Sequence, residues 1–240
     1  MYSIELILSP QLYPTCETPQ PAIGVGVDVL RATTAICAAL KAGAEHIVPL
    51  DSLEQLAIFA TKGYTLAAER NGSKIDGAKC GNSPTEYLRT DLHGQRLAYS
   101  TTNGTRCLLR LADCGEVYAG CFSNLSVLAT YLADRKSNII ILCSGWKGTP
   151  SFEDTLFSGG LIQKLIATRR FSIANDSATM ALQLWEQNSD NLEDACRKAT
   201  HVHRLIKLGY EEDIQFSLQL DTCGVIPRLV DGCIKDISNL

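Results

Sequence analysis

Short apolar runs alternate with helix-forming segments along most of the chain, and this alternation limits the folds open to it. Residues 23–28, 96–100 and 138–143 are runs of this kind, and each leads through a polar turn toward a segment of good helix formers. Alternating strands and helices build a largely parallel sheet with helices on both faces. The sequence therefore predicts an α/β fold, arranged as a three-layer α/β/α structure with a largely parallel sheet.

The expected elements follow one another at short intervals. Strands are expected at 1–9, 23–28, 46–50, 64–68, 96–100, 116–119 and 138–143, and helices at 35–41, 53–61, 84–88, 106–112, 124–133 and from about 155 to 166. Glu5 inside the first apolar run favours an edge strand for residues 1–9. Residues 71–84 are expected to form a long loop. The chain after Asn175 is expected to be mainly helical, with a returning strand near 224–234. Residues 1–240 are predicted to form a single α/β domain, with two lobes of β-turn-α-β units as the alternative.

Composition excludes several classes of function. The formal net charge of −4 provides no basic face for nucleic acid and no polybasic membrane patch. The N-terminus lacks the basic start of a signal peptide, and no apolar stretch approaches the ~18 residues of a membrane span. A cytoplasmic location is the default expectation. The ten cysteines include no C-x-x-C pair, so we expect most of them to be buried small hydrophobes rather than zinc ligands or disulfides.

Four polar loops follow expected strands: 28–34, 69–84, 100–105 and 144–154. The carboxyl ends of parallel strands lie at one edge of a sheet, where α/β proteins bind ligands. We therefore expect the four loops to converge. The first loop could bind a metal and a phosphate together through Asp28, Arg31, Thr33 and Thr34. Capping of the following helix by Asp28 and Thr33 explains part of the pattern equally well.

Acidic residues in these loops are candidate metal ligands. Mg²⁺ prefers carboxylate oxygens together with water and phosphate oxygens. Asp28, Glu69, Glu153 and Asp154 form the candidate set, and the alternative for Glu153 and Asp154 is favourable charge at a helix N-terminus.

Cationic and small polar residues complete the candidate site. Arginine suits bidentate binding of phosphate or sulfonate, and we favour Arg31 and Arg70 over Arg106 and Lys147. Turn chemistry alone explains many of the small donors. The candidate donors are Thr33, Thr34, Asn82, Ser83, Thr101, Thr102, Asn103, Gly104 and Thr105. No P-loop or G-x-S-x-G elbow occurs. His201 and His203 are two residues apart, so on a helix they point in different directions and make a poor metal pair. No catalytic histidine is expected, although a lone one remains open.

With these residues in view, the chain resembles the 2-phosphosulfolactate phosphatase family. The matching stretches are Asp28–Thr34, Glu69-Arg70, Gly81–Pro84, Ser100–Thr105 and Ser151–Asp154 with Gly159. The resemblance implies an α/β fold and Mg²⁺-dependent hydrolysis of 2-phospho-3-sulfolactate, a small phosphorylated and sulfonated acid, to 3-sulfolactate and phosphate. In archaea that step serves coenzyme M biosynthesis. Ser100 and Cys80 depart from the expected threonine and bulkier residue.

The mechanistic hypothesis gives Asp28, Arg31 and Glu69 the catalytic roles. Asp28, with Glu69, Glu153 or Asp154, binds Mg²⁺, and Arg31 neutralises the phosphoryl group. Arg70, Arg106 or N–H groups near Asn103 and Gly104 hold the sulfonate and carboxylate. A metal-bound water is favoured as nucleophile over Asp28 because Leu30 removes a D-x-D pattern. The alternatives are a hydrolase of another small phosphorylated acid and a non-catalytic anion-binding protein. A homodimer is the default for oligomeric state.

Overall fold

The computed structural model describes residues 1–18 and 21–238. The strands are β1 (Tyr2–Ile7), β2 (Ile23–Val27), β3 (His46–Leu50), β4 (Thr65–Arg70), β5 (Ser73–Lys74), β6 (Arg96–Ser100), β7 (Glu116–Gly120), β8 (Ile139–Cys143), β9 (Phe171–Ile173), β10 (Pro227–Val230) and β11 (Cys233–Asp236). The α-helices are α1 (Ala32–Lys41), α2 (Glu54–Thr61), α3 (Pro84–Arg89), α4 (Gly104–Arg110), α5 (Leu125–Ala133), α6 (Phe152–Ala167), α7 (Asp176–Asn188), α8 (Leu192–Cys196), α9 (Thr200–Lys207) and α10 (Glu211–Ser217). Two short 3-10 helices, η1 (Pro10–Thr15) and η2 (Phe122–Asn124), complete the described chain.

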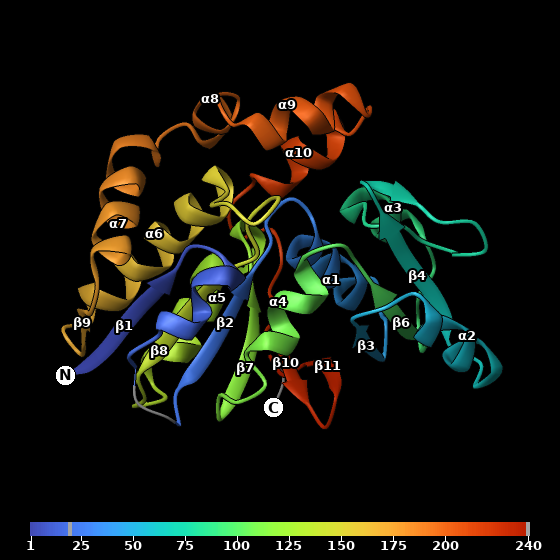
Figure 1. Cartoon of the computed structure of the whole chain (residues 1–240), viewed down its shortest axis with the longest axis horizontal. Helices are drawn as coiled ribbons and strands as arrows, with labels where there is room; N and C mark the ends of the chain where they lie inside the picture. The colour runs from blue at the N-terminus through green and yellow to red at the C-terminus, as the bar shows by residue number, and fades with distance from the viewer. Residues whose placement is uncertain (19–20, 239–240) are drawn as a thin grey trace.

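The strands form one mixed, mostly parallel sheet, as the alternation of elements predicts. Its order is β5-β4-β6-β3-β11-β10-β7-β2-β8-β1-β9. Two parallel groups, β4-β6-β3 and β7-β2-β8-β1-β9, are joined through the antiparallel hairpin β10–β11 (Figure 1). The single returning strand expected near 224–234 is therefore two strands. The hairpin pairs with β3 on one side and with β7 on the other, so the C-terminal segment connects the two groups.

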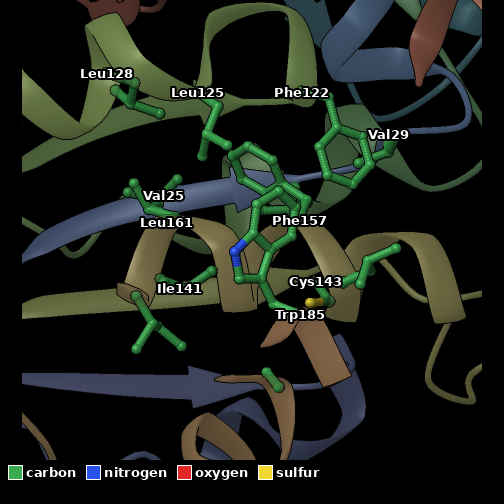
Figure 2. Packing of buried hydrophobic residues seen from close by; sticks show 14 of the residues in the cluster. Val25, Val29, Phe122, Leu125, Leu128, Ile141, Cys143, Phe157, Leu161 and Trp185 are labelled. Atoms are coloured by element: carbon green, nitrogen blue, oxygen red, sulfur yellow. The ribbon is translucent and has the colours of Figure 1, made fainter. Parts of the chain in front are cut away.

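The main core lies where α5, α6 and α7 cover β8 and its neighbours. All five residues of β8 are buried, which confirms its expected central place. The Phe122 ring meets Phe157 edge-on at 5.6 Å and stacks on Trp185 at 6.2 Å (Figure 2). A Cβ at Gly159 would lie 2.0 Å from the carbonyl oxygen of Ala181, so glycine is what allows α6 and α7 to approach so closely.

The expectation that the first strand lies at the sheet edge is wrong. β1 pairs in parallel with both β8 and β9, so it is an interior strand. Glu5 is tolerated there because its carboxylate accepts hydrogen bonds from Thr18 Oγ1 (2.5 Å), the Thr18 N–H (2.8 Å) and the Glu17 N–H (3.2 Å). The segment after η1 folds back over β1 and supplies these donors. A charged residue in an apolar run thus indicates a local partner here, and not an exposed edge.

Two smaller differences concern the loops and helix boundaries. Residues 71–84 are not wholly irregular, because β5 pairs with the end of β4. Both α1 and α4 begin two or three residues earlier than expected, so Thr33, Thr34 and Thr105 belong to helices. None of the helices in the described ranges is long and apolar enough to cross a membrane. Part of the connection at 10–21 lies outside the described residues.

The variant Glu5→Gln tests the buried carboxylate of β1. The amide keeps the shape but replaces an acceptor oxygen with a donor that faces N–H groups, so unfolding free energy should fall by about 1–3 kcal/mol. Burial raises the pKa of Glu5, but the hydrogen bonds from Thr18 and Glu17 outweigh it and the net pKa is lowered. The stabilisation is therefore present above the ordinary pKa of 4.5 and is lost as pH falls through the lowered pKa.

Denaturant unfolding of both proteins between pH 3 and pH 7 would measure this difference. The matched control is Glu186→Gln on the exposed face of α7, which should leave stability almost unchanged. A Glu5→Gln protein as stable as the wild type at neutral pH would contradict the assignment.

Candidate active site

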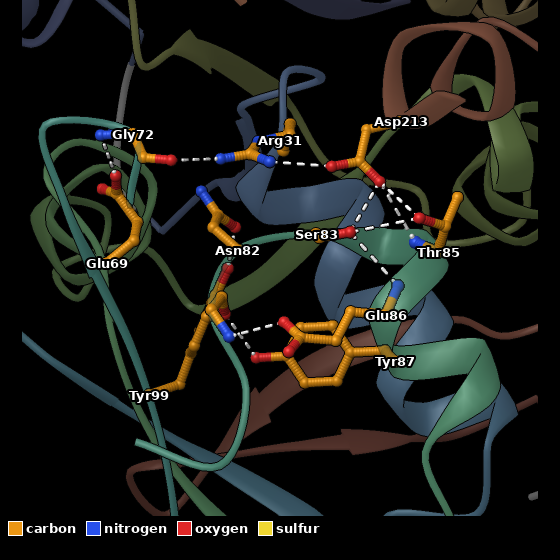
Figure 3. Close-up of polar contacts among 11 residues, drawn as sticks. Arg31, Glu69, Gly72, Asn82, Ser83, Thr85, Glu86, Tyr87, Tyr99 and Asp213 are labelled. Carbon is orange, nitrogen blue, oxygen red and sulfur yellow. Dashed lines mark hydrogen bonds and ion pairs between the residues drawn. The ribbon is translucent and has the colours of Figure 1, made fainter. Parts of the chain in front are cut away.

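The loops after β2, β4, β6 and β8 meet around one pocket of about 180 Å³, and α9 closes its far side. This confirms that the four polar loops converge. The lining residues are Asp28, Leu30, Arg31, Glu69, Asn71, Gly72, Asn82, Thr101, Thr102, Asn103, Trp146, Lys147, His201, Arg204 and Leu205. Figure 3 shows one wall, where Arg31, Glu69, Gly72 and Asn82 lie together. The volume is below the 300–1,000 Å³ typical of drug-sized ligands, so the pocket suits a small molecule.

Asp28 follows β2 directly and points toward the start of α4. Its Oδ1 accepts a weak hydrogen bond from the Ala32 N–H at 3.4 Å, so its charge is only partly compensated. The pKa of Asp28 is raised to about 6, chiefly by burial; the carboxylates of Glu69 and Glu153 contribute to the rise, whereas His201 and the Ala32 N–H oppose it.

Glu153 lies in the first turn of α6 and is 1 % exposed. Its Oε1 lies 2.7 Å from His201 Nδ1, and the His201 ring stacks on Trp146 at 5.3 Å. Its Oε2 is buried and has no hydrogen-bond partner among the described residues. A buried carboxylate oxygen without a donor is costly unless a cation approaches it, so this atom is a candidate metal ligand.

Asp154 has a different environment from its neighbour Glu153. Oδ1 accepts from the Val29 N–H at 2.8 Å. Oδ2 accepts from Ser151 Oγ (2.5 Å), Ser144 Oγ (3.2 Å) and the Gly145 N–H (3.3 Å). Burial raises the pKa of Asp154 well above its usual range, with Glu153 and Asp28 adding to the rise. Four donors therefore fasten the loop after β8 to the loop after β2 through this carboxylate, and it does not line the pocket.

Glu69 lines the pocket and also holds two loops in place. Oε1 accepts from the Thr102 N–H (2.8 Å) and Oγ1 (2.6 Å), and Oε2 accepts from the Gly72 N–H (2.7 Å). Both oxygens are thus already paired. Within residues 1–18 and 21–238, no three Asp, Glu, His or Cys side chains are grouped so that they could hold a metal ion together. Of the four predicted ligands, Asp28 and Glu153 retain the most unpaired negative charge.

Arg31 is the N-cap residue of α1 and is 2 % exposed. Its Nη1 donates to Asp213 Oδ2 at 2.7 Å, and its Nη2 donates to the Gly72 carbonyl at 2.9 Å (Figure 3). The Tyr210 ring lies 3.7 Å from the guanidinium carbon. Arg31 therefore lines the pocket as part of a buried ion pair that ties α1 to α10.

Several predicted donors stabilise the loops and do not face the pocket. Thr33 Oγ1 accepts from the Asp28 N–H (3.1 Å), and Thr34 Oγ1 donates to the Val29 carbonyl (2.8 Å). Ser83 is the N-cap of α3, as its place before Pro84 predicts, and its Oγ donates to Asp213 Oδ1 (2.6 Å). The Thr105 N–H donates to Thr101 Oγ1 at 3.1 Å. Turn and capping chemistry accounts for these positions.

Two of the predicted arginines do not line the pocket. Arg70 Nη1 donates to the Glu69 carbonyl (2.6 Å), and Nη2 donates to Ser100 Oγ (2.9 Å). Arg106 is exposed, contacts the Asp51 carbonyl at 3.4 Å, and lines a separate surface hollow. The helix α4 begins at Gly104, so Arg106 lies in its first turn, where its side chain reaches the Asp51 carbonyl and not the pocket. The cations that do line it are Arg31, Lys147 and Arg204.

The remaining predicted polar residues lie at the pocket itself. Asn82 accepts from the Tyr99 hydroxyl, Thr102 bonds to Glu69, and Asn103 Nδ2 donates to the Gly145 carbonyl at 3.5 Å. Gly104 packs against Asp28, because an added Cβ would lie 2.3 Å from Ala32 Cβ and 2.6 Å from Asp28 Oδ2. The close approach of two loops explains why a glycine occupies this position.

Sequence reasoning missed His201, Arg204 and Asp213. All three come from the helices after Asn175, where no local pattern marks a site. His201 is the lone site histidine that the sequence left open but gave no reason to choose. A larger hollow of about 450 Å³ lies along β1, but its described lining includes Glu5 and Glu17 and no lysine or arginine. It therefore suits an anionic ligand less well than the pocket at the four loops.

The fold and the pocket define an α/β protein with buried carboxylates and cations around a small polar cavity at its strand ends. The chain belongs to the 2-phosphosulpholactate phosphatase family, whose model matches residues 7–232. It is 36% identical over 216 residues to the probable 2-phosphosulfolactate phosphatase of Caldanaerobacter subterraneus subsp. tengcongensis, covering 88% of this chain and 89% of the relative. The protein of the same name from Gloeothece citriformis is 38% identical over 225 residues, covering 91% and 92%.

The variant Gly104→Ala tests the close packing beside Asp28. The added methyl group would overlap Ala32 and the Asp28 carboxylate, so the two loops must separate and unfolding free energy should fall by about 1–3 kcal/mol. Thermal or denaturant unfolding measures the loss. Gly224→Ala is the matched control, since a Cβ there meets nothing within 4 Å. Equal stability of the two variants would show that the loops are not closely packed at Gly104.

Proposed function

We propose that this protein is a Mg²⁺-dependent phosphatase that hydrolyses 2-phospho-3-sulfolactate to 3-sulfolactate and phosphate. Family membership supports the reaction class, and relatives with 36% and 38% identity carry the name of this activity. The observation that carries the proposal is the proximity of two incompletely compensated buried carboxylates: Asp28 lines a pocket that also contains cationic side chains, and Glu153 lies beside it, bonded to the pocket residue His201. A phosphorylated acid needs both features.

The residues present fit a Mg²⁺ ion. The unpartnered Oε2 of Glu153 and the carboxylate of Asp28 would hold it, while Glu69 and Asp154 would fix the loops around them. When bound, Mg²⁺ supplies positive charge that offsets charge on the phosphoryl oxygens. Repulsion between Asp28 and Glu153, which contributes to the raised pKa of Asp28, would be relieved by such a cation.

The cations of the pocket would bind the anionic groups of the substrate. Lys147, in the loop after β8, and Arg204, on α9, both line the pocket and would hold the sulfonate and the carboxylate, in place of Arg70 and Arg106. Arg31 has remaining N–H donors but is held by Asp213 and Gly72, so its charge would act on the phosphoryl group from a fixed position. A preorganised cation of this kind stabilises the transition state without having to rearrange.

His201 would donate a proton to the leaving group. Its Nδ1 is committed to Glu153, which leaves Nε2 as the ring nitrogen available to the substrate. Cleavage of the P–O bond releases a secondary alkoxide, a poor leaving group that must gain a proton. The attacking oxygen is water or the Asp28 carboxylate, and isolation of a phosphorylated peptide that contains Asp28 would establish the second route.

The first experiment measures phosphate release from 2-phospho-3-sulfolactate with and without Mg²⁺, for the wild type and Asp28→Asn. Metal-dependent turnover should fall roughly 10²-fold or more in the variant, because it loses a carboxylate that would hold the Mg²⁺ ion. Asp190→Asn, at an exposed position, is the control and should keep wild-type turnover. If the wild type binds the compound without turnover, or turns over only other phosphorylated acids, the proposed substrate is wrong.

A second experiment measures Mg²⁺ binding directly, by calorimetry and by the shift of the unfolding temperature. Asp28→Asn and Glu153→Gln should each weaken binding at least about tenfold, because each removes a carboxylate ligand. Glu186→Gln on α7 is the control and should bind Mg²⁺ as the wild type does. Unchanged Mg²⁺ affinity in folded Glu153→Gln would remove Glu153 from the proposed ligand set.

A further inference from the structure

Three cysteines from distant parts of the chain lie together behind the pocket. Cys37 is in the middle of α1, Cys121 follows β7, and Cys223 lies between α10 and β10. Cys121 Sγ is 3.5 Å from Cys37 Sγ, and Cys223 Sγ is 3.6 Å from the Cys37 carbonyl oxygen. The Cys37 thiol is also close enough to Cys223 to affect the pKa of the Cys223 thiol. Cys37 is thus the central member, in contact with both others, and none of the three lines the pocket.

Two other buried cysteines, Cys107 and Cys143, have an oxygen atom as their hydrogen-bond partner. Cys107 donates to the Leu142 carbonyl at 3.1 Å, and Cys143 lies 3.5 Å from Ser158 Oγ. These contacts are those of small buried hydrophobes with weak donors, as the composition predicts. No disulfide joins the ten cysteines, all of which lie in the described part of the chain. The three-cysteine cluster therefore differs from its surroundings by its sulfur-to-sulfur contacts.

The three thiols are not equivalent. The hydrogen bond from Cys37 lowers the pKa of Cys223 to about 7 against the opposing effect of burial, and Lys41 also lowers it. Burial raises the pKa of Cys37 well above its usual range, so Cys37 keeps the proton. Cys223 is also the least buried of the three, with 6 % exposure against 0 % for the other two. The residue that follows it, Gly224, is exposed, and so is Asp221, two residues before it. A thiolate near the surface is the species that reacts with disulfides.

We propose that Cys37, Cys121 and Cys223 form a thiol–disulfide centre in which Cys37 is the shared partner and a low-molecular-weight disulfide is the oxidant. The Cys223 thiolate attacks one sulfur of the oxidant, its S–S bond breaks, and one small thiolate leaves. Cys37 then gives up its proton and attacks the Cys223 sulfur, which releases the second small thiol. Two electrons pass from the cysteine pair to the oxidant, and one internal disulfide forms.

The geometry makes the second step short. A disulfide needs a separation of about 2 Å between sulfurs. The Cys37 and Cys121 sulfurs are already 3.5 Å apart, and the Cys223 sulfur lies 3.6 Å from the backbone of Cys37. Cys121 Sγ also lies 3.0 Å from Ser123 Oγ. Exchange can therefore move the bond from Cys37–Cys223 to Cys37–Cys121 without leaving the cluster. Either product contains Cys37, and this defines the test.

The experiment exposes the folded full-length protein to graded mixtures of oxidised and reduced glutathione at neutral pH. Remaining thiols are blocked with N-ethylmaleimide, and unreduced peptides are mapped by mass spectrometry. We expect one disulfide that contains Cys37, bonded to Cys223 or Cys121, with the loss of two hydrogen masses and full reversal by dithiothreitol. Cys223→Ser should slow its formation at least about tenfold, because the reactive thiolate is missing.

Cys37→Ser and Cys196→Ser are the matched pair of variants. Both are buried cysteines in helices, but Cys196 lies outside the cluster, so only Cys37→Ser should abolish the internal disulfide. Circular dichroism verifies that each variant is folded, and the wild-type map decides the question if Cys37→Ser does not fold. The proposal is overturned if Cys37 remains a thiol in oxidised wild type, or if disulfides are spread among other cysteines. Neither outcome depends on the proposed phosphatase activity.

Discussion

The burial of four carboxylates around one small pocket is the constraint on which the structure of the site depends. Asp28, Glu69, Glu153 and Asp154 are all buried, and a buried carboxylate persists only where donors or cations compensate it. Asp154 has four such donors and Glu69 has three, drawn from the loops after β2, β4, β6 and β8. The loops adopt their conformations because these acids must be satisfied.

The four carboxylates do not receive equal numbers of hydrogen bonds, and this difference separates the structural acids from the candidate functional ones. Within residues 1–18 and 21–238, the Asp28 carboxylate accepts one long hydrogen bond and the Glu153 carboxylate has one partner, His201. Their mutual repulsion contributes to the raised pKa of Asp28. A carboxylate with a raised pKa in a cleft, as Asp28 is, is typical of functional sites. The same burial that shapes the loops therefore leaves negative charge where a cation would be favourable.

The convergence of the loops could be predicted from the sequence, because polar residues after successive parallel strands must gather at the strand ends. Asp28, Glu69, Asn82, Thr102 and Asn103 were identified in this way and line the pocket. Their individual partners could not be predicted. Arg31 reads as a free cation in the sequence, but its partner Asp213 is 182 residues away on a helix with no distinguishing pattern.

The sheet shows the same limit of sequence reasoning. Alternation predicts strands and helices, and β8 lies centrally as its apolar composition indicates. Glu5 misled the placement of β1 because its donors belong to a loop that folds back over the strand. The hairpin β10–β11, which joins the two parallel groups, follows a long helical segment, so its place between β3 and β7 is set by tertiary packing alone.

The C-terminal segment makes two buried contacts with α1, besides the exposed hydrogen bond from Lys41 to the Thr222 carbonyl, and these make it part of the site and not an accessory to it. Asp213 of α10 holds Arg31 at the first point, and Cys223 meets Cys37 at the second, about 9 Å further along the helix axis. Both contacts are buried, so α10 and the segment that follows it cannot shift without disturbing α1. Because α1 begins at the pocket, the ion pair that fixes the cation and the thiols that pack behind it act on the same rigid element.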